Sequence, residues 1–477
     1  MHIEDRQNTK IVATVGPASN SYAQLLELAK AGVDVFRLNF SHGTHSDHLE
    51  VINHINYINE KYGIHLGILA DLQGPKLRVG KIKDEPIMLE EGDEITFVNE
   101  PCIGTREKVY MSYQQFAADV SKGERVLLDD GKLVLEVLET NKKDTVRLKT
   151  LFGGPLSSNK GVNLPETKTS LPALTEKDLQ DLEFILGQKV NWIALSFVRS
   201  HKDVDLLRRM IDEKQHKAKI IAKIEKPEAV DKIDKIIKAS NGIMIARGDL
   251  GVEVPIERLP MIQKEIISKC IQRARPVIVA TQMMDSMIQN PSPTRAEVTD
   301  VANAVLDGAD AVMLSAETSV GRHPVKVVQA MNRIIMEAEK QYSIKSKRPK
   351  LSDKSSTFLS DVICFNAAKT AEDVNAKAII GMTISGYTAF KISSYRPRSR
   401  VIIFSDQPTI LGTLNLVWGV RCHYYDKFSS TDETIEDVVE ILKKKKIVKN
   451  GDVIVNTGSM PLHKKGRTNM LKITQIE

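Results

Sequence analysis

Apolar residues in the first part of the chain alternate between short continuous runs and longer amphipathic stretches. The runs at 10–15, 33–40 and 64–72 are rich in β-branched residues, which is typical of buried parallel strands. Amphipathic segments at 21–31 and 47–61 lie between them and have the periodicity of helices. This repetition of strand and helix predicts a parallel α/β fold.

The same alternation resumes after residue 171, where Thr175 is the expected cap of a helix. Five further apolar runs follow, and we expect them to be strands at 190–197, 219–225, 242–246, 276–281 and 310–315. Together with the first three runs they make eight parallel strands separated by helices. That arrangement predicts a (β/α)8 TIM barrel of the α/β class.

The segment between the two halves of this pattern consists of short alternating runs without a long amphipathic stretch. Asp130-Gly131 between apolar runs is a strong hairpin signal, so we expect an inserted all-β lid domain. A polar segment at 345–354 then leads to a C-terminal α/β domain, with strands expected at 378–383, 401–405 and 452–457. The expected boundaries are 1–74 and 171–345 for the barrel, 75–170 for the lid and 346–477 for the C-terminal domain.

Composition narrows the class of protein. Hydrophobic residues make up 42% of the 477 positions and charged residues 27%, the balance of a globular protein with a full core. The net charge of +6 suits small anionic substrates, and the lysine run 443–446 lies in a helical pattern as a solvated face. No apolar run is as long as a membrane span, the chain starts with polar residues, and the four cysteines form no CxxC pair. We therefore expect a cytoplasmic protein with neither a membrane nor a nucleic acid as partner.

The run Lys219–Glu225 ends in an unusual way for a buried strand. Lys223 and Glu225 are alternate residues, so their side chains share one face about 7 Å apart. A salt bridge at the rim of the barrel is the simplest interpretation, and a functional pair is the alternative. Other strands also end in polar residues, and the carboxyl ends of barrel strands meet at one face. These further residues are Arg37, Asn39, Asp71, Gly248, Asp249 and Thr281.

The types of residue at these ends predict a chemistry. Glu225 and Asp249 come from adjacent strands and could share a hard cation such as Mg²⁺, with Mn²⁺ as an alternative. Lys223 and Arg37 supply positive charge for a phosphoryl group or an enolate, and Gly248 lets a ligand approach the backbone closely. A purely structural ring of ion pairs is the competing interpretation. The residues alone predict Mg²⁺-dependent chemistry on a small phosphorylated or carboxylated substrate, over which the lid could close.

Several long stretches closely resemble the pyruvate kinase family. They are Phe36–Gly43, Ile221–Lys226, Met244–Pro255, Ala280–Met283, Pro293–Val298 and Asp300–Asp310. The resemblance extends from about Thr9 to the carboxyl end, and the family's barrel, inserted lid and C-terminal α/β domain match the three expected domains. It implies the last step of glycolysis, in which phosphoenolpyruvate and ADP give pyruvate and ATP with Mg²⁺. It also implies a homotetramer, the usual assembly of the family.

The resemblance assigns roles to the strand-end residues. Glu225 and Asp249 would hold the metal that bridges enzyme and substrate, while Lys223 would contact the transferring phosphoryl group and the developing enolate. Arg37 would hold the substrate phosphate. Thr281 would lie near the enolate carbon, where it could help to relay a proton. The remaining substrate and nucleotide contacts would come from Gly248 and from Asn39, Phe40, Ser41, His42, Arg78 and Lys160.

Three histidines, His42, His45 and His48, recur at three-residue spacing. Zinc ligation is one interpretation of this spacing. We expect instead a solvent-facing helix start, with His42 near the nucleotide.

One segment departs from the family pattern. Many family members need a monovalent cation, usually K⁺, and carry Thr, Lys and Glu at the positions of Leu72, Gln73 and Lys76. The ammonium group of Lys76 could take the place of a K⁺ held by that acid, so we expect the K⁺-independent branch of the family. A lysine on the surface of the lid hinge is the alternative. The family's K⁺ position corresponds to Asn39, Ser41, Asp71 and Leu72.

A second candidate site lies in the C-terminal domain. Its segment 383–388 resembles the Thr-x-Ser-Gly-x-Ser loop by which many relatives bind a sugar-phosphate activator. Small hydroxyls and backbone amides at a helix start suit phosphate, and the loop 458–469 adds cations. We expect activation by a sugar phosphate or AMP, with an ordinary strand–helix turn as the alternative. The candidate residues are Thr383, Ser385, Gly386, Tyr387 and Thr388.

Two other functions compete with pyruvate kinase. Another Mg²⁺-dependent pyruvate or enolate enzyme, such as an aldolase or lyase, needs no ADP site, so Lys160 in the lid argues against it. A binding protein with an inactive site does not fit the intact set of Arg37, Lys223, Glu225 and Asp249. Within this set we expect Lys223 to point into the open mouth and Glu225 toward Asp249, without a direct pair between Lys223 and Glu225.

Overall fold

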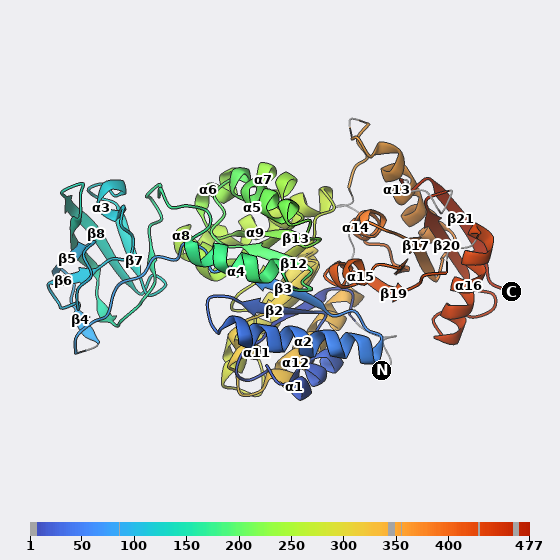
Figure 1. Cartoon of the computed structure of the whole chain (residues 1–477), viewed down its shortest axis with the longest axis horizontal. Helices are drawn as coiled ribbons and strands as arrows, with labels where there is room; N and C mark the ends of the chain where they lie inside the picture. The colour runs from blue at the N-terminus through green and yellow to red at the C-terminus, as the bar shows by residue number, and fades with distance from the viewer. Residues whose placement is uncertain (1–6, 85, 342–348, 354, 428–429, 461–466) are drawn as a thin grey trace.

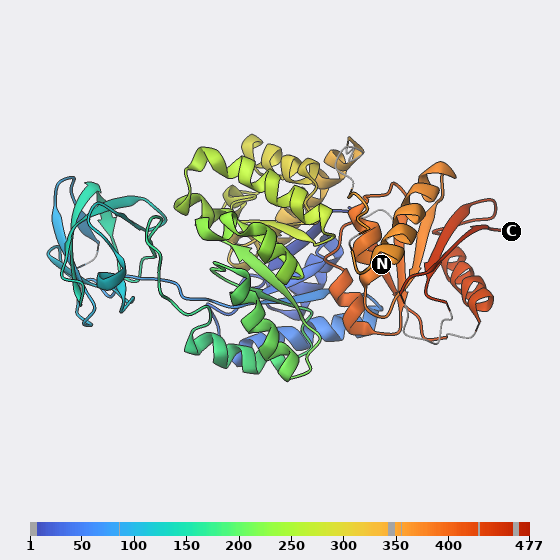
Figure 2. The same cartoon turned by 90° about the horizontal axis from the view of Figure 1, so that it is seen from above.

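The computed structural model describes residues 7–84, 86–341, 349–353, 355–427, 430–460 and 467–477. Three bodies follow one another along its long axis (Figure 1). A small β-rich domain stands at one end, the barrel occupies the middle, and the C-terminal domain lies against the other side of the barrel. A view from above shows the same row, with extended stretches of chain joining the β-rich domain to the barrel (Figure 2).

The middle body is a closed barrel of eight parallel strands, in the order β1-β16-β15-β14-β13-β12-β3-β2. Both faces of each strand are covered, which explains the continuous apolar runs of the sequence. Val12, Leu69, Ile221 and Ile278 fill the interior, and the residues that alternate with them pack under the outer helices. The TIM barrel prediction is confirmed. The strands are β1 Lys10–Thr14, β2 Val35–Asn39, β3 Gly67–Asp71, β12 Trp192–Leu195, β13 Lys219–Ile224, β14 Gly242–Ala246, β15 Val277–Ala280 and β16 Ala311–Leu314.

Helices surround the barrel, and α4 begins at the Thr175 cap expected from sequence. Thr175 accepts a hydrogen bond from the amide of Asp178 in a capping box, and Ser21 caps the first helix. The main helices are α1 Tyr22–Ala31, α2 His45–Tyr62, α4 Glu176–Leu186, α5 His201–Glu213, α7 Ile233–Ala239, α9 Leu259–Gln272, α10 Arg295–Asp307 and α12 Pro324–Lys340. Shorter ones are α6 Pro227–Asp231, α8 Arg247–Glu253, α11 Ala316–Ser319, η1 Ile256–Arg258 and η2 Asp285–Ile288.

The inserted lid has its own hydrophobic core and a six-stranded sheet in the order β11-β7-β8-β9-β5-β6. The predicted hairpin is β7–β8, with Asp130-Gly131 at its tip. The expected lid boundaries fall in the loop after β3 and in the loop before α4. The elements are β4 Ile87–Leu89, β5 Glu94–Val98, β6 Lys108–Tyr110, α3 Phe116–Asp119, β7 Arg125–Leu128, β8 Leu133–Thr140, β9 Thr145–Phe152, β10 Gly154–Leu156 and β11 Val162–Asn163.

The C-terminal domain is a five-stranded sheet in the order β19-β18-β17-β20-β21, with β21 antiparallel. The strands expected at 378–383, 401–405 and 452–457 are β17, β18 and β20, whereas β19 and β21 carry too many polar residues for their sequence to predict them. The elements are α13 Phe358–Asp373, β17 Ala378–Met382, α14 Tyr387–Ser394, β18 Arg400–Ser405, α15 Pro408–Leu414, β19 Val420–Tyr424, α16 Thr431–Lys444, β20 Val453–Gly458 and β21 Met470–Gln475. Across the described ranges, no helix is both long and apolar enough to cross a bilayer.

Buried polar contacts fix the C-terminal domain to the amino-terminal ends of the barrel strands. The ammonium group of Lys10 donates to the carbonyl of Val420 at 2.9 Å, and Trp192 Nε1 donates to the carbonyl of Thr413 at 3.2 Å. These contacts leave the opposite face of the barrel, where the strands have their carboxyl ends, for the lid.

Candidate active site

Strands β2, β3 and β13 bring a row of charged side chains to the carboxyl face of the barrel. Arg37 Nε donates to Asp71 Oδ2 at 2.6 Å, and its Nη1 donates to Thr14 Oγ1 at 3.0 Å. Lys223 Nζ lies 3.3 Å from Asp71 Oδ1 and 3.1 Å from Glu225 Oε1. Cations and carboxylates therefore alternate along the row from Arg37 to Glu225. Such alternation makes buried charges tolerable.

The contact between Lys223 and Glu225 corrects one prediction. We expected Lys223 to point into the open mouth without pairing with Glu225, and the 3.1 Å distance shows that this is wrong. Lys223 is only 9% exposed and also donates to Ser196 Oγ at 2.7 Å. A buried ammonium group needs such partners, and alternate residues of one strand provide them. The pair is a buried one and not a salt bridge at the rim.

The pKa values in the row follow from burial and from these neighbours. Burial alone would lower the pKa of Lys223, but the carboxylates of Asp71 and Glu225 outweigh it and hold the pKa above its ordinary value. Burial alone would raise the pKa of Asp71, but Lys223 and Arg37 outweigh it and hold the pKa low. The pKa of Glu225 is raised, because burial and the nearby Asp249 together exceed the effect of Lys223. Lys223 is therefore charged at neutral pH.

Glu225 and Asp249 fit a hard cation. Glu225 is buried, and its Oε2 accepts a hydrogen bond from the amide of Phe197 at 2.5 Å, while Asp249 at the start of α8 is partly exposed. The pKa of Glu225 is raised first by burial and then by the negative charge of Asp249, and an additional cation would neutralise that second contribution. Over the described part of the chain, no three His, Cys, Asp or Glu side chains come together as a metal group. Glu225 and Asp249 would thus hold Mg²⁺ together with ligands other than His, Cys, Asp or Glu side chains.

Gly248 and Thr281 lie together at the ends of β14 and β15. The amide of Gly248 donates to Thr281 Oγ1 at 2.6 Å, and Thr281 has a φ of +70°, which is strained for a β-branched residue. Arg247 holds this turn, since it donates to the carbonyl of Thr281 at 2.9 Å and pairs with Asp300 at 2.6 Å. Our sequence reasoning missed the supporting roles of Arg247 and Ser196. The position of each residue directly after a barrel strand was the signal in the sequence that could have identified these roles.

The predicted nucleotide residues after β2 form a compact turn. Asn39 Oδ1 accepts a hydrogen bond from the amide of Ser41 at 3.2 Å, and the carbonyl of Phe40 accepts one from Lys177 at 2.6 Å. His42 is exposed, as expected for a solvent-facing helix start. His45 and His48 have separate contacts, His45 with Asp181 at 2.8 Å and His48 with the carbonyl of His42 at 3.0 Å. This arrangement gives no support to a zinc site.

The lid residues lie apart from the charged row. Lys160 pairs with Asp129 within the lid at 2.9 Å, and Arg78 donates to the carbonyl of Asn159 at 2.9 Å. In this conformation, both side chains are thus engaged by the lid itself. Lys76 is the exception, because its Nζ lies 3.8 Å from Asp249 Oδ1 at the mouth. Leu72 is buried, and its carbonyl accepts a hydrogen bond from Ser196 Oγ at 2.7 Å.

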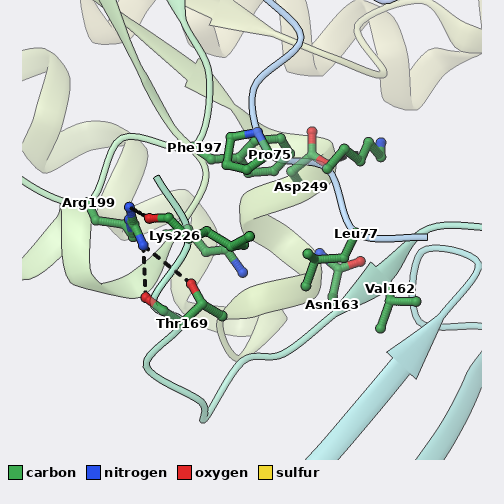
Figure 3. Close-up of a pocket in the computed structure, with 11 residues that line it drawn as sticks. Pro75, Leu77, Val162, Asn163, Thr169, Phe197, Arg199, Lys226 and Asp249 are labelled. Carbon is green, nitrogen blue, oxygen red and sulfur yellow. Dashed lines mark hydrogen bonds and ion pairs between the residues drawn. The ribbon is translucent and has the colours of Figure 1, made fainter. Parts of the chain in front are cut away.

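A small pocket lies between the stem of the lid and the mouth of the barrel. Figure 3 shows Asp249, Lys226 and Asn163 around this space. Asn163 of the lid donates to Glu253 Oε1 at 2.8 Å, and Lys226 pairs with the same oxygen at 2.5 Å. The lid therefore contacts α8, the helix that carries Asp249, at a carboxylate that also pairs with Lys226.

The candidate effector loop is a turn that leads into α14. Thr383 Oγ1 accepts a hydrogen bond from the amide of Gly386 at 2.9 Å, and Gly386 has a φ of +82°. Ser385 Oγ accepts from the amide of Tyr387 at 3.4 Å, and Thr388 contacts Thr468. Ser385 is exposed and Thr388 is buried. Within the cationic loop 458–469, residues 461–466 lie outside the described residues.

Two family models match the chain. The model described as pyruvate kinase, barrel domain, matches residues 6–328, and the model described as pyruvate kinase, alpha/beta domain, matches residues 361–474. A pyruvate kinase of Corynebacterium glutamicum is 43% identical over 467 residues, which cover 98% of this chain and 97% of the relative. One from Geobacillus stearothermophilus is 41% identical over 475 residues, which cover 99% of this chain and 81% of the relative.

A solved structure agrees with these relatives. The crystal structure of a pyruvate kinase from Cryptosporidium parvum matches this fold with a TM-score of 0.92 at 36% identity. The match covers 99% of this chain and 96% of that protein. The barrel, the lid, the C-terminal domain and these matches along nearly the whole chain lead to one conclusion. The chain belongs to the pyruvate kinase family.

Proposed function

We propose that the protein transfers the phosphoryl group of phosphoenolpyruvate to ADP and so produces pyruvate and ATP. The observation that carries this proposal is the buried row of Arg37, Asp71, Lys223 and Glu225 at the carboxyl face of the barrel. Phosphoryl transfer needs little covalent help from the protein, but it needs positioned cations for the charge of the transferring group. Lys223 and Arg37 are such cations, because carboxylates on both sides of Lys223 keep it charged and in place.

In this proposal each residue of the row has a separate task. Arg37 binds the substrate phosphate, and Lys223 stabilises the charge of the transferring group and of the enolate oxygen that forms when the phosphoryl group leaves. Glu225 and Asp249 would hold Mg²⁺, which supplies further positive charge to the phosphoryl oxygens when it is bound. Mn²⁺ has the same preference for oxygen ligands and is the expected substitute.

The turn of Gly248 and Thr281 supports a role in substrate binding. Thr281 Oγ1 accepts a hydrogen bond from Gly248 and itself donates to the carbonyl of Ala280 at 2.6 Å, so its orientation is set before substrate arrives. We place this hydroxyl near the enolate carbon, where it would help to deliver the proton that forms the methyl group. The contact of Arg247 with the carbonyl of Thr281 keeps the strained turn in place.

We assign the nucleotide to the space between the barrel mouth and the lid. Asn39, Phe40, Ser41 and His42 form the turn on the barrel side, and Lys160 and Arg78 approach from the lid. Lys160 is paired with Asp129, so nucleotide binding requires it to exchange this carboxylate for a phosphate. A closing movement of the lid would deliver both cations and exclude water from the transfer.

A coupled assay tests the proposed reaction. Pyruvate is measured with lactate dehydrogenase and NADH while ADP, phosphoenolpyruvate and Mg²⁺ are each omitted in turn. We expect NADH oxidation only when all three are present. Pyruvate formation without ADP would contradict the proposal and would indicate a phosphatase instead.

We further propose that the enzyme does not require K⁺. The support is Lys76, whose ammonium group lies at the mouth beside Asp249 and so brings a fixed positive charge to this region. The assay is repeated in buffers free of both Na⁺ and K⁺. Turnover should be retained there, and a many-fold loss that added K⁺ restores would overturn this part of the proposal.

We also propose that a sugar phosphate or AMP activates the enzyme at the loop 383–388. Its support is the set of small hydroxyls and the backbone amides at the start of α14, which together suit a phosphate group. Sugar phosphates and AMP are titrated at sub-saturating phosphoenolpyruvate, with Ser385→Ala as the matched variant. A flat response of the wild-type protein to every compound would contradict the proposal.

We also propose that the protein is a homotetramer and that it is located in the cytoplasm. Exposed apolar side chains on η1 and α9, Ile256 and Met261, each 66% accessible, support burial against another subunit. The free thiols of all four cysteines suit a reducing compartment. Light scattering coupled to size-exclusion chromatography measures the mass, and a monomer at working concentrations would contradict the assembly.

A further inference from the structure

The first turn of α4 lies where the two segments that join the lid to the barrel come together. Figure 1 shows this helix on the side of the barrel to which the lid is attached. We call the segments 72–76 and 170–175 the lid stems. Asp178, a buried residue of this first turn, accepts from the amide of Gly74 at 3.0 Å and from the amide and hydroxyl of Thr175 at 2.8 and 2.6 Å. One carboxylate therefore fixes both lid stems.

The residue next to Asp178 on this helix contacts the turn 39–42, which we assigned to the nucleotide. The ammonium group of Lys177 donates to the carbonyl of Phe40 at 2.6 Å and pairs with Asp181, one helical turn further on, at 2.6 Å. Asp181 is buried and also contacts His45 Nε2 at the start of α2 at 2.8 Å. The buried carboxylate therefore holds the more exposed lysine side chain against the turn.

Aromatic rings and a backbone hydrogen bond hold the same turn from other directions. His48 stacks on Phe40 with centroids 4.2 Å apart, and His45 stacks on Phe184 of α4 at 4.4 Å. The amide of Phe40 donates to the carbonyl of Asp71, the central carboxylate of the charged row, at 3.0 Å. The turn therefore lies between α4 and β3 and has contacts with both.

The contact of Lys177 fixes the peptide unit between Phe40 and Ser41. A peptide unit is planar, so its carbonyl and its amide rotate together. Lys177 donates to the carbonyl, and Asn39 Oδ1 accepts from the amide of Ser41 at 3.2 Å on the opposite edge of the plane. Packing does not require a cation here, because 47% of the Lys177 side chain is exposed. The function of the contact is therefore to orient the turn.

We propose that Lys177 and Asp181 are positioning residues for nucleotide binding, and that α4 couples the turn 39–42 to the lid stems. This inference rests on the proposed nucleotide site between the barrel mouth and the lid. Lys177 and Asp178 are adjacent on one helical turn, so a shift of the lid stems moves the contact with Phe40 as well. Nucleotide binding and lid closure thus favour the same position of α4.

Equilibrium binding of ADP tests the positioning role without relying on turnover. ADP with Mg²⁺ is titrated into the full-length protein by isothermal titration calorimetry, in the absence of phosphoenolpyruvate. In Lys177→Met the Kd for ADP should rise about tenfold, because the peptide unit is no longer fixed from its carbonyl side. Lys177→Arg keeps a cation at this place and should stay within about threefold of the wild type. An unchanged Kd in folded Lys177→Met would overturn the proposal.

The matched control is Lys202→Met. Lys202 is exposed and is the second residue of α5, just as Lys177 is the second residue of α4. The Kd for ADP in this control should equal that of the wild type. Equal weakening in Lys202→Met and Lys177→Met would contradict the proposal, because it would indicate a general effect of positive charge at the mouth. Asp181→Asn should weaken ADP binding by a factor similar to that of Lys177→Met, and wild-type affinity in the folded variant would contradict the role of Asp181.

Steady-state kinetics separate this inference from the proposed reaction. Lys177→Met should raise the KM for ADP about tenfold, while kcat at saturating ADP and the KM for phosphoenolpyruvate stay within about twofold. A fall in kcat without a change in the KM for ADP would contradict a positioning role. If the wild type binds ADP but forms no pyruvate, the proposed reaction fails, and the calorimetric comparison still decides the role of Lys177.

Hydrogen exchange measured by mass spectrometry tests the coupling to the lid stems. In the wild type, ADP should slow the exchange of the amides of Gly74 and Thr175, because a fixed α4 keeps Asp178 against both of them. At ADP concentrations that give equal occupancy, this slowing should be at least about threefold smaller in Lys177→Met. Equal slowing in the two proteins would overturn the coupling.

Discussion

At the scale of single residues, the site is a row of alternating charges and not a set of independent groups. Asp71 shows this most clearly, since one buried carboxylate contacts both Arg37 and Lys223. Each cation is kept in place by a carboxylate. When substrate or metal binds, the cation could give up its contact with that carboxylate. Lys223 is therefore both a structural partner of Glu225 and the proposed catalytic cation.

Asp71→Asn tests how strongly the row is coupled. Removing this negative charge leaves two buried cations without their shared partner, so we expect the free energy of unfolding to fall by roughly 3 kcal/mol. Urea unfolding without ligands measures the change. Asp93→Asn is the control, because its pair with Arg106 is exposed to solvent and should contribute far less to stability. Equal effects of the two substitutions would contradict the account.

Lys76→Glu tests the proposed replacement of K⁺. The substitution removes a cation beside Asp249 and restores an acid of the kind found in K⁺-dependent relatives. Activity without K⁺ should fall at least about tenfold, a barrier change of about 1.4 kcal/mol, and added K⁺ should restore it. Lys81→Glu, an exposed lysine of the lid, is the control. A loss that K⁺ does not restore would show that Lys76 has a different role.

Sequence reasoning placed Arg37, Asp71, Lys223 and Glu225 of the candidate site at one face of the barrel but did not predict all of their contacts. Alternation along one strand was enough to place Lys223 and Glu225 on the same face. It could not show that burial would draw the ammonium group onto Glu225, because exposure depends on strands and loops distant in the sequence. Ser196 was missed for a similar reason, since its hydroxyl becomes important only when β12 lies beside β13.

At the scale of elements, the contact between the lid and α8 joins the proposed nucleotide site to the proposed metal ligands. Asn163 at the end of β11 reaches Glu253 on α8, and Gly131 at the tip of the β7–β8 hairpin approaches Val252 of the same helix, where an added Cβ would lie 3.5 Å from Cγ1. Asp249 lies in the first turn of this helix. A movement of the lid could therefore displace α8 and with it Asp249, one of the proposed metal ligands.

Asn163→Ala tests this connection. The variant loses a hydrogen bond to a buried carboxylate, worth about 1.5–3 kcal/mol, while the pair of Lys226 and Glu253 remains. We expect the KM for ADP to rise about tenfold, with a smaller effect on the KM for phosphoenolpyruvate. Asn141→Ala, in a distal turn of the lid, is the control. Equal increases in both KM values would argue against a role of this contact in nucleotide capture.

The elements themselves were predictable where local signals agree. The barrel strands are continuous apolar runs, and the lid hairpin has the expected Asp-Gly turn. By contrast, β19 carries Arg421 and His423, and β21 is an edge strand with several exposed residues. Their membership in the sheet depends on neighbours that local patterns do not describe.

At the scale of the whole molecule, buried charges join the C-terminal domain to the barrel. Lys10 with Asp34 and Arg396 with Asp310 lie in this seam, although such residues look like surface residues in the sequence. The seam also contains His423, whose Nε2 is buried without a hydrogen-bond partner in the described chain. The seam should therefore be sensitive to acid.

A pH series tests that sensitivity. Burial lowers the pKa of His423 to about 3 from an ordinary value of 6.5, so the unfolded chain binds the proton first as the pH falls. Stability is thus present above pH 6.5 and is lost progressively toward pH 3, by an amount on the order of a few kcal/mol. Urea titrations at pH 7, 5.5 and 4.5 measure the free energy of unfolding, which should fall less steeply with decreasing pH in His423→Gln than in the wild type. The same pH dependence in His423→Gln, in the wild type and in the control His54→Gln would contradict this view.

The central claim, that Lys223 carries phosphoryl transfer in a barrel of the pyruvate kinase family, is tested most directly by single-turnover kinetics. Phosphoenolpyruvate, ADP and Mg²⁺ are mixed with excess wild-type protein or Lys223→Met, and ATP and pyruvate are measured in quenched samples. The folded fraction is matched by circular dichroism. The account predicts equal amounts of ATP and pyruvate in the wild type and a rate at least about 10³-fold lower in Lys223→Met. A transfer rate in the folded variant close to that of the wild type would contradict it.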